Sequence, residues 1–585
     1  MNSDASRGHA AKQLQETVGA GWQQAMDAMA TAGLAAGFPA LQVPQFNLPP
    51  FPQALPAVRF DPARLQALQQ RYLEDAAELW NQCLRSSNDA PLAADRRFSA
   101  EAWQVNPVSK FSAAAYMLNA RTLMSLAEAV QGDAKTKARV RFAVEQWMAA
   151  TAPSNFMALN AEAQQKAISS QGESIAQGLA NMLHDMKLGH VSMTDESIFE
   201  VGKNVATTEG AVVFENEFFQ LLEYKPLTAK VHERPFLLIP PCINKFYILD
   251  LQPDNSLIRY AVAQGHRTFV VSWRNPDESM AGKTWDDYIE HAAIKAIEVV
   301  QEITGAKTIN ALGFCVGGTI LGTALAVLAA RGKKPVASAT FLTSLLDFTD
   351  TGILDIFIDE TSVRYRETEM GKGGLLKGQE LASTFSFLRP NDLVWNYVVG
   401  NYLKGETPPP FDLLYWNSDS TNLPGPFYAW YLRNTYLENN LVKPRHTVVC
   451  DQKVDFGLAD MPAYIYGSRE DHIVPIGGAY ASTRVLPGKK RFVMGASGHI
   501  AGVINPPAKN KRSYWTRDKL PQGKFPEAHA DWFKGATEHA GSWWPDWADW
   551  LKGYAGKQVT APKGYGNKKY RAIEPAPGRY VKVKA

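Results

Sequence analysis

The chain has 585 residues, of which 45% are hydrophobic and 20% charged, a composition that excludes a disordered chain and favours about two folded domains. Its 61 basic and 58 acidic residues leave a net charge of +3, which gives no electrostatic case for binding nucleic acid. The four cysteines are scattered without a C-x-x-C pair, so we expect a reducing cytoplasm and no disulfide framework.

The first 58 residues predict a flexible N-terminal segment that ends in a linker. Residues 1–13 carry no basic stretch followed by an apolar one, so no secretory signal is expected. Prolines gather between 37 and 56, which indicates an extended connection. The longest nearly apolar stretch of the chain, 319–330, is too short to span a bilayer, and we therefore predict no transmembrane segment.

Residues 59–199 have the periodicity of helices. Apolar side chains recur at spacings of three and four between Leu65 and Trp80, and similar patterns run over 111–130 and 140–148. We therefore predict a mainly helical N-terminal domain at 59–199.

From residue 200 onward, short apolar runs alternate with helical patterns. Such runs are typical of buried parallel strands, and their alternation with helices predicts an α/β domain with a doubly wound sheet at 200–585. The alternation fails at about 349–455, where we predict a cap inserted over the sheet. The six expected strands are 236–239, 268–271, 309–312, 339–342, 464–466 and 492–494.

Cys315 lies in a glycine-rich turn between an expected strand and the helical pattern at 319–330. The spacing G-x-C-x-G, from Gly313 to Gly317, is that of the nucleophile elbow of an α/β-hydrolase, with cysteine in place of serine. The glycines suit a sharp turn in which helix and strand pass closely. A thiol in this position points to thioester chemistry, whereas the alternative is a small buried apolar residue.

An elbow nucleophile needs an acid and then a histidine later in the chain. Asp471 and His499 each follow an expected strand, and their order after Cys315 fits this requirement. We predict that His499 takes the proton of the thiol and that Asp471 orients the imidazole. His472 is a rival base, for which an exposed loop residue is the alternative account.

Acyl transfer also needs an oxyanion hole. One donor is expected to be the backbone N–H of Val316, and the other that of Ile243, in the loop after an earlier strand. Asn244, Asp250 and His472 are further candidates for supporting the substrate site, although Asp250 is equally well explained as an acid at a helix start. No histidine spacing typical of zinc occurs, so no metal is expected.

Together these motifs closely resemble those of the class I polyhydroxyalkanoate synthases, which make poly(3-hydroxybutyrate). The resemblance is dense over 200–585 and looser over 60–200. The matching motifs are PPCINK at 240–245, SWRNP at 272–276, GFCVGG at 313–318, GSREDH at 467–472, GHIAG at 498–502 and GSWWP at 541–545.

The resemblance implies that Cys315 attacks a short (R)-3-hydroxyacyl-CoA and that CoA leaves as a product, so no bound cofactor is required. The 3-hydroxyl of another unit then attacks an acyl-thioester, with His499 as general base and Asp471 assisting. The cap would exclude water. The resemblance also implies a homodimer on the surface of cytoplasmic polyester granules, with phasin-type proteins as partners.

Two alternatives remain. A cysteine-dependent thioesterase or hydrolase could use the same fold, because fold alone does not fix the reaction. A non-enzymatic granule-coat protein with an inactive hydrolase fold is the second. Insoluble polyester formed from 3-hydroxybutyryl-CoA would separate the synthase from both.

Overall fold

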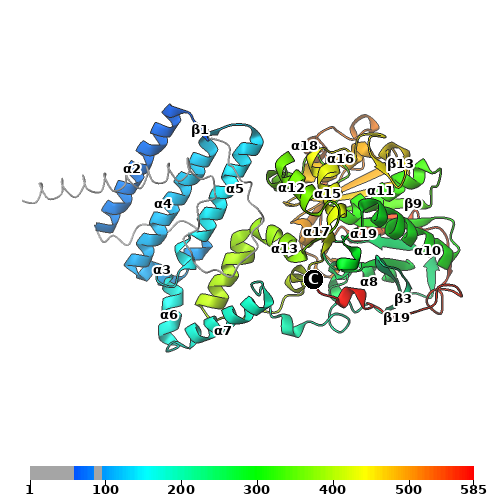
Figure 1. Cartoon of the computed structure of the whole chain (residues 1–585), viewed down its shortest axis with the longest axis horizontal. Coiled ribbons are helices and arrows are strands. Elements are labelled where there is room, and N and C mark those ends of the chain that lie inside the picture. The colour runs from blue at the N-terminus through cyan, green and yellow to red at the C-terminus, as the bar shows by residue number, and fades with distance from the viewer. Residues whose placement is uncertain (1–57, 85–94) are drawn as a thin grey trace, which may run out of the picture. The chain divides into compact units, whose positions relative to one another are not determined.

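The computed structural model describes residues 58–84 and 95–585 (Figure 1). They divide into two compact units. The first comprises the described residues up to Asp195 together with Ser383–Pro410, and the second comprises Glu196–Ala382 and Phe411–Ala585. The flexible segment predicted at 1–58 lies outside the described residues, except for Val58.

The first unit is built from helices. The chain folds back at Asn106, whose side chain accepts the N–H groups of Val108 and Ser109 and caps the long helix that begins at Pro107. Figure 1 shows α2, α4 and α5 side by side. The helices are α2 (Pro62–Leu84), α3 (Glu101–Val105), α4 (Pro107–Ala129), α5 (Ala134–Ala150), α6 (Ala161–Ser169) and α7 (Glu173–Leu188).

The segment Ser383–Pro410 belongs to the first unit, which differs from the division expected from the sequence, where it was part of the cap. Asn181 Nδ2 donates a hydrogen bond to the carbonyl of Asn401 at 3.0 Å, and Lys404 Nζ lies 2.5 Å from a carboxylate oxygen of Glu162. These contacts join residues more than 200 positions apart. A local sequence pattern carries no information about such distant partners. The sequence therefore predicts the cap as one continuous segment, about 349–455.

The second unit contains an eleven-stranded sheet. Its six central strands are parallel and coincide with the six expected from the sequence, which confirms the α/β prediction. In spatial order they are β7 (Thr268–Trp273), β6 (Phe236–Ile239), β8 (Ile309–Phe314), β9 (Val336–Leu342), β14 (Ala463–Ser468) and β15 (Lys490–Gly495).

Antiparallel strands extend both edges of this sheet, and the sequence analysis did not predict them. Two lie beyond β15 and three beyond β7. They are β16 (Ser513–Thr516) and β17 (Thr537–Ala540) at one edge, and β4 (Phe219–Tyr224), β3 (Gly210–Glu215) and β19 (Glu574–Pro575) at the other.

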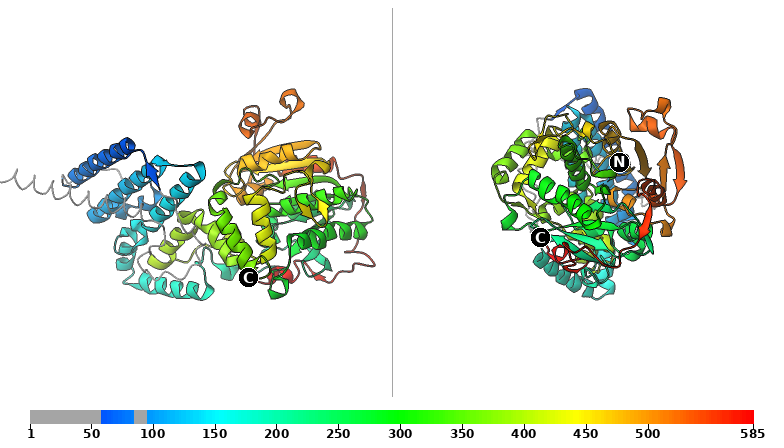
Figure 2. Two further views of the ribbon diagram at one scale, coloured as in Figure 1. Left: turned by 45° about the horizontal axis from the view of Figure 1, so that its top comes forward. Right: turned by 90° about the vertical axis from the view of Figure 1, so that its right-hand side faces the viewer.

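Helices cover both faces of the sheet (Figure 2). On one face lie α10 (Lys295–Thr304), α11 (Val316–Ala330) and α16 (Ile476–Val485). On the other lie α8 (Leu257–Ala263) and α19 (Trp544–Lys552). Nearly all of α11 is buried, which explains why its sequence is apolar on every side.

The remaining helices of the second unit lie mostly in the long connection between β9 and β14. A further short helix, α9 (Trp285–Tyr288), precedes α10, and α17 (His499–Val503) follows β15. The connection carries α12 (Glu360–Met370), α13 (Gly378–Phe387), α14 (Asp412–Ser418) and α15 (Gly425–Tyr431).

The strand order places the functional loops together. The chain runs from β6 to β7 on one side and then places β8 on the other side of β6. The carboxyl ends of β6 and β8 are therefore neighbours at a point where the strand order reverses, which is where ligands bind in open α/β sheets. In the part of the chain that the structure describes, no helix is both long enough and apolar enough to cross a membrane.

Candidate active site

Cys315 occupies the turn between β8 and α11 in a backbone conformation that few residues adopt. Its φ is 54° and its ψ is −129°. The N–H of Cys315 donates to the carbonyl of Leu342 at 2.9 Å, which ties the turn to strand β9. A strained backbone at a nucleophile, held by its surroundings, agrees with the elbow predicted from the G-x-C-x-G spacing.

The glycines after Cys315 allow the helix to pass close to the sheet. A Cβ atom on Gly317 would lie 2.2 Å from the carbonyl oxygen of Ile239 at the end of β6, and one on Gly318 would lie 2.0 Å from Ser344 Oγ. A side chain at either position would displace backbone or buried neighbours. The motif therefore reflects packing of α11 against β6 and the end of β9.

Asp471 and His499 lie at the carboxyl ends of β14 and β15 and contact one another. His499 Nδ1 is 2.7 Å from Asp471 Oδ2, and both side chains are buried, at 5% and 0% exposure. The N–H groups of Ile473 and Val474 donate to the other carboxylate oxygen at 2.8 and 2.9 Å. Because a carboxylate only accepts, Nδ1 carries the hydrogen, and Nε2 is left to exchange a proton with Cys315.

His499 interacts with Cys315 by a side-chain hydrogen bond and by charge. Burial alone would lower the pKa of His499, but Coulomb attraction and hydrogen bonds to Asp471 and Cys315 outweigh it and raise the pKa to about 10. These interactions therefore favour the protonated form of His499.

The rival base His472 lies in the loop after β14. It is half-buried and adjoins Asp471 in sequence, yet the carboxylate turns to His499. The geometry favours His499 for the proton transfer, and a supporting role for His472 stays a prediction.

Asp250 is buried and joins the segment before β3 to the start of α8. Its carboxylate accepts the hydroxyls of Thr208 and Ser256, both at 2.6 Å, and Ser256 is the N-cap of α8. Burial raises the pKa of Asp250, and the hydrogen bonds from Ser256 and Thr208 oppose that rise. These contacts favour the account of Asp250 as an acid that organises a helix start.

The expected oxyanion donors lie on neighbouring segments. Val316 is the first residue of α11, so its N–H has no acceptor within the helix. The loop after β6 is fixed by a hydrogen bond of 2.8 Å from the N–H of Thr421 to the carbonyl of Ile243 and by a bridge between Asn244 and Ser420. The assignment of Val316 and Ile243 as donors, and of Asn244 as substrate support, stays a prediction.

Two tyrosines, one buried and one partly buried, lie near the thiol, and the sequence analysis did not single them out. Tyr431 and Tyr436 hydrogen-bond each other, and both interact electrostatically with Cys315. Their rings meet edge to face, with centroids 5.6 Å apart, and Phe348 packs on both. The only sequence signal was the aromatic density around 427–436, which a plain core would show equally.

No metal site is evident among residues 58–84 and 95–585, since no three histidine, cysteine, aspartate or glutamate side chains there group as ligands. The three cysteines at 242, 315 and 450 are all free thiols. Cys242 is buried, and this burial raises the pKa of its thiol. It is therefore a structural residue of the loop after β6 rather than a second nucleophile.

Two family models match the sequence of the chain. Residues 94–261 match the model described as the N-terminus of poly-beta-hydroxybutyrate polymerase (PhaC), and 235–506 match the alpha/beta hydrolase fold. Solved structures resemble the chain weakly. A complex of DcsB with its substrate analogue is 13% identical with a TM-score of 0.32, covering 50% of this chain and 91% of its own.

Curated relatives match over nearly the whole length. The poly(3-hydroxyalkanoate) polymerase subunit PhaC of Cupriavidus necator is 63% identical over 539 residues, covering 91% of this chain and 90% of the relative. The corresponding subunit of Rhizobium meliloti is 39% identical, covering 90% and 87%. Poly(3-hydroxyalkanoate) polymerase 1 of Ectopseudomonas oleovorans is 38% identical, covering 86% and 89%. The chain therefore belongs to the poly(3-hydroxyalkanoate) polymerase family.

Proposed function

We propose that the chain polymerises short (R)-3-hydroxyacyl-CoA, chiefly 3-hydroxybutyryl-CoA, into polyhydroxyalkanoate with release of CoA. The observation that carries this proposal is the 63% identity, over 539 residues, with a poly(3-hydroxyalkanoate) polymerase. The cysteine at the elbow supports it, because a thiol can accept the acyl group of a CoA thioester and hold it as a new thioester. CoA is a product of this reaction, and no bound cofactor takes part.

The first step is transfer of the acyl group to Cys315. In this proposal His499, which is hydrogen-bonded to Cys315, takes the proton of the thiol, and the thiolate that forms is the nucleophile. The thiolate attacks the carbonyl carbon, a new carbon–sulfur bond forms, and the bond to the CoA sulfur breaks. The imidazolium of His499 then donates its proton to the departing CoA sulfur.

The second step lengthens the chain. Acylation turns the thiolate of Cys315 into a neutral thioester and so removes one of the charges that raise the pKa of His499. The imidazole, neutral since it gave its proton to CoA, can then accept the proton of a 3-hydroxyl. The hydroxyl oxygen bonds to the acyl carbon as the carbon–sulfur bond breaks, and Asp471 stabilises the imidazolium that forms. The N–H groups of Val316 and Ile243 are the proposed donors to the oxyanion.

Water must be kept from the acyl-enzyme, because hydrolysis would end the chain. The connection at about 349–455, apart from the segment that packs in the first unit, supplies the proposed cap. The aromatic side chains of Phe348, Tyr431 and Tyr436 support this role, since they pack on one another and both tyrosines interact with Cys315.

An apolar stripe along α7 supports the proposed association with the polyester surface. Four of its large side chains recur at helical spacing and are about half exposed: Ile175 51%, Leu179 52%, Leu183 49% and Met186 52%. A helix with a continuous exposed apolar face is typical of segments that lie on an apolar surface. We refer to these four residues as the α7 stripe.

The remaining assignments follow from the family resemblance. We propose that the protein is cytoplasmic and acts on polyhydroxyalkanoate granules, that it forms a homodimer, and that phasin-type granule proteins are its partners. The proposal includes no nucleic-acid partner.

The proposal is tested by supplying purified protein with (R)-3-hydroxybutyryl-CoA. Free thiol is measured with a chromogenic reagent, and the products are separated into insoluble polyester and soluble 3-hydroxybutyrate. We expect release of CoA together with polyester. Release of CoA with only soluble acid would instead identify a thioesterase, and no release at all would favour a non-enzymatic granule-coat protein.

A further inference from the structure

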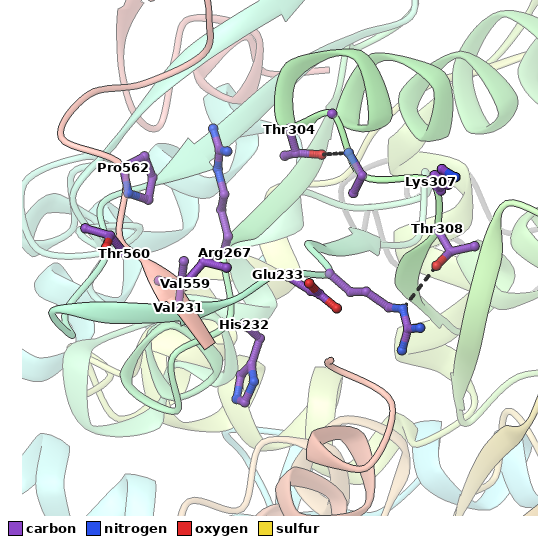
Figure 3. A pocket seen from close by; sticks show the side chains of 13 residues that line it. Val231, His232, Glu233, Arg267, Thr304, Lys307, Thr308, Val559, Thr560 and Pro562 are labelled. Atoms are coloured by element: carbon purple, nitrogen blue, oxygen red, sulfur yellow. Dashed lines mark hydrogen bonds between the residues drawn. The ribbon is translucent and has the colours of Figure 1, made fainter. Parts of the chain in front are cut away.

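A second cavity lies in the second unit at the amino ends of the parallel strands (Figure 3). Its volume is about 500 Å³, which lies in the range of small-molecule sites. One wall is formed by strand β5 (Lys230–His232) with its antiparallel partner β18 (Gln558–Thr560), and another by residues 304–308 between α10 and β8. Figure 3 shows Lys307 and Thr308 on the opposite side from Thr560.

This cavity is separate from the active site. Thr308 directly precedes β8 and Cys315 directly follows it, so the two residues are about 23 Å apart at a rise of about 3.3 Å per residue. A ligand in the cavity therefore cannot reach the thiol. The polymerisation chemistry does not explain why the cavity is lined as it is.

Arg234 contributes a guanidinium whose partners are neutral. Its Nε donates to Thr308 Oγ1 at 3.1 Å, and its Nη1 donates to the carbonyl of Tyr554 at 2.8 Å. No carboxylate lies within ion-pair distance of this half-buried group in the part of the chain described. Several of its five N–H donors remain for a ligand. The hydroxyl of Thr308, which accepts from Arg234, keeps its own hydrogen to donate.

The other charges of the cavity divide into paired and unpaired groups. Arg267 is bound to the buried carboxylate of Glu223 at 2.6 Å, and Glu233 lies 4.0 Å from Lys557. Lys307 is exposed and, among the described residues, has no acidic side chain within 4.0 Å. Two positive charges, those of Arg234 and Lys307, are therefore left without a counter-charge at one hollow.

His232 supplies an independent sign of a missing polar partner. It lines the cavity, is 5% exposed, and its Nδ1 has no hydrogen-bond partner among the described residues. Its ring stacks on that of His266 with centroids 4.8 Å apart, which holds it in place. A buried polar atom without a partner costs stability, so a ligand or water that binds it there would be favoured.

We propose that this cavity binds a small phosphate-bearing anion, held by the guanidinium of Arg234 and the ammonium of Lys307. A phosphate group carries about two negative charges, which match the two uncompensated cations. The planar fork of arginine fits two phosphate oxygens at once, and the hydroxyls of Thr308 and Thr560, which line the cavity, can donate to the remaining oxygens. This inference does not depend on the proposed polymerase activity.

Isothermal titration calorimetry of the full chain with sodium pyrophosphate, at constant ionic strength, tests the proposal. We expect saturable binding at one site per chain. Lys307→Gln should weaken it about tenfold, the loss of one charge-assisted contact. The matched control is Lys372→Gln, an exposed lysine elsewhere in the second unit, which should leave the affinity unchanged. Adenosine 5′-diphosphate as a second probe distinguishes a phosphate ester, bound more tightly than pyrophosphate, from a free inorganic anion.

Arg234→Gln should weaken binding further, but it also removes the bonds to Thr308 and Tyr554, so its thermal unfolding is measured as well. Lys307→Gln keeps those bonds and decides the outcome. The absence of saturable heat in the wild type, or equal affinity in Lys307→Gln and Lys372→Gln, would overturn the proposal. CoA release by Lys307→Gln should match that of the wild type, which separates this result from any failure of the polymerase assignment.

Discussion

The imidazole of His499 and the carboxylate of Asp471 form a buried contact of 2.7 Å at the ends of two adjacent parallel strands. Two backbone N–H groups hold the second carboxylate oxygen, so the acid cannot turn away from the ring. The contact orients Nε2 of His499 for exchange with Cys315, and the predictions about catalysis follow from it.

Replacing Asp471 by Asn should lower kcat for CoA release by roughly 10³-fold or more. An amide keeps the shape but can donate to Nδ1, which favours the wrong tautomer and removes the charge that stabilises imidazolium. The measurement is CoA release under saturating substrate, with circular dichroism to verify folding. A loss of less than tenfold in a folded variant would show that Asp471 does not orient the base.

His499→Gln should abolish CoA release, whereas His472→Gln should retain it within about threefold. His499 contacts both Asp471 and Cys315, which is the arrangement that a general base for the thiol requires. The two variants are compared in the same assay. The reverse order of activities would make His472 the base.

The value of kcat/KM should decrease on the alkaline side of its pH profile, near pH 10. Below that pH, the pKa of about 10 keeps His499 protonated and able to donate to the leaving CoA sulfur, and above it the imidazole is neutral. Asp471→Asn removes an attraction that raises this pKa, so the alkaline fall should move to lower pH. An unchanged position in the variant would contradict the assigned cause of the shift.

Gly317→Ala should lower the free energy of unfolding by about 2–3 kcal/mol. The added Cβ would lie 2.2 Å from the carbonyl oxygen of Ile239, a backbone atom that cannot easily move. Gly282→Ala is the control, since nothing lies within 4 Å of its Cβ position. Urea unfolding measures both, and equal stabilities would mean that α11 does not pack as closely as described.

The α7 stripe should control attachment to polyester rather than catalysis. Leu179→Ser with Leu183→Ser replaces two large exposed apolar side chains and should reduce the fraction that sediments with purified granules several-fold, with CoA release from soluble substrate preserved. Ala176→Ser, on the same helix, removes little apolar area and is the control. Equal sedimentation of all three proteins would exclude the α7 stripe as the contact.

The parallel strands were predictable because each is a run of apolar residues bounded by turns, as in Phe236–Ile239. The edge strands were not, since segments such as Thr537–Ala540 are polar and exposed, and their pairing depends on a distant neighbour. For the same reason, the sequence did not predict that Ser383–Pro410 packs in the first unit: its contacts are with residues distant in the sequence.

Within the candidate site, Cys315, Asp471 and His499 could be proposed because each follows a strand in an order that the chemistry fixes, and the structure brings Asp471 and His499 into contact. Tyr431 and Tyr436 could not be found in that way. They approach the thiol through the fold of the long connection between β9 and β14, and an aromatic residue in a core has the same local sequence as one that lines a site.

The most direct test is mass spectrometry of the protein quenched during turnover with (R)-3-hydroxybutyryl-CoA and digested to peptides. Covalent catalysis through the elbow predicts that the 3-hydroxybutyryl group, or a short oligomer of it, is found on the peptide that contains Cys315 and is absent from Cys315→Ala. An acyl group on the peptide of Cys242, or on any residue other than Cys315, would contradict it.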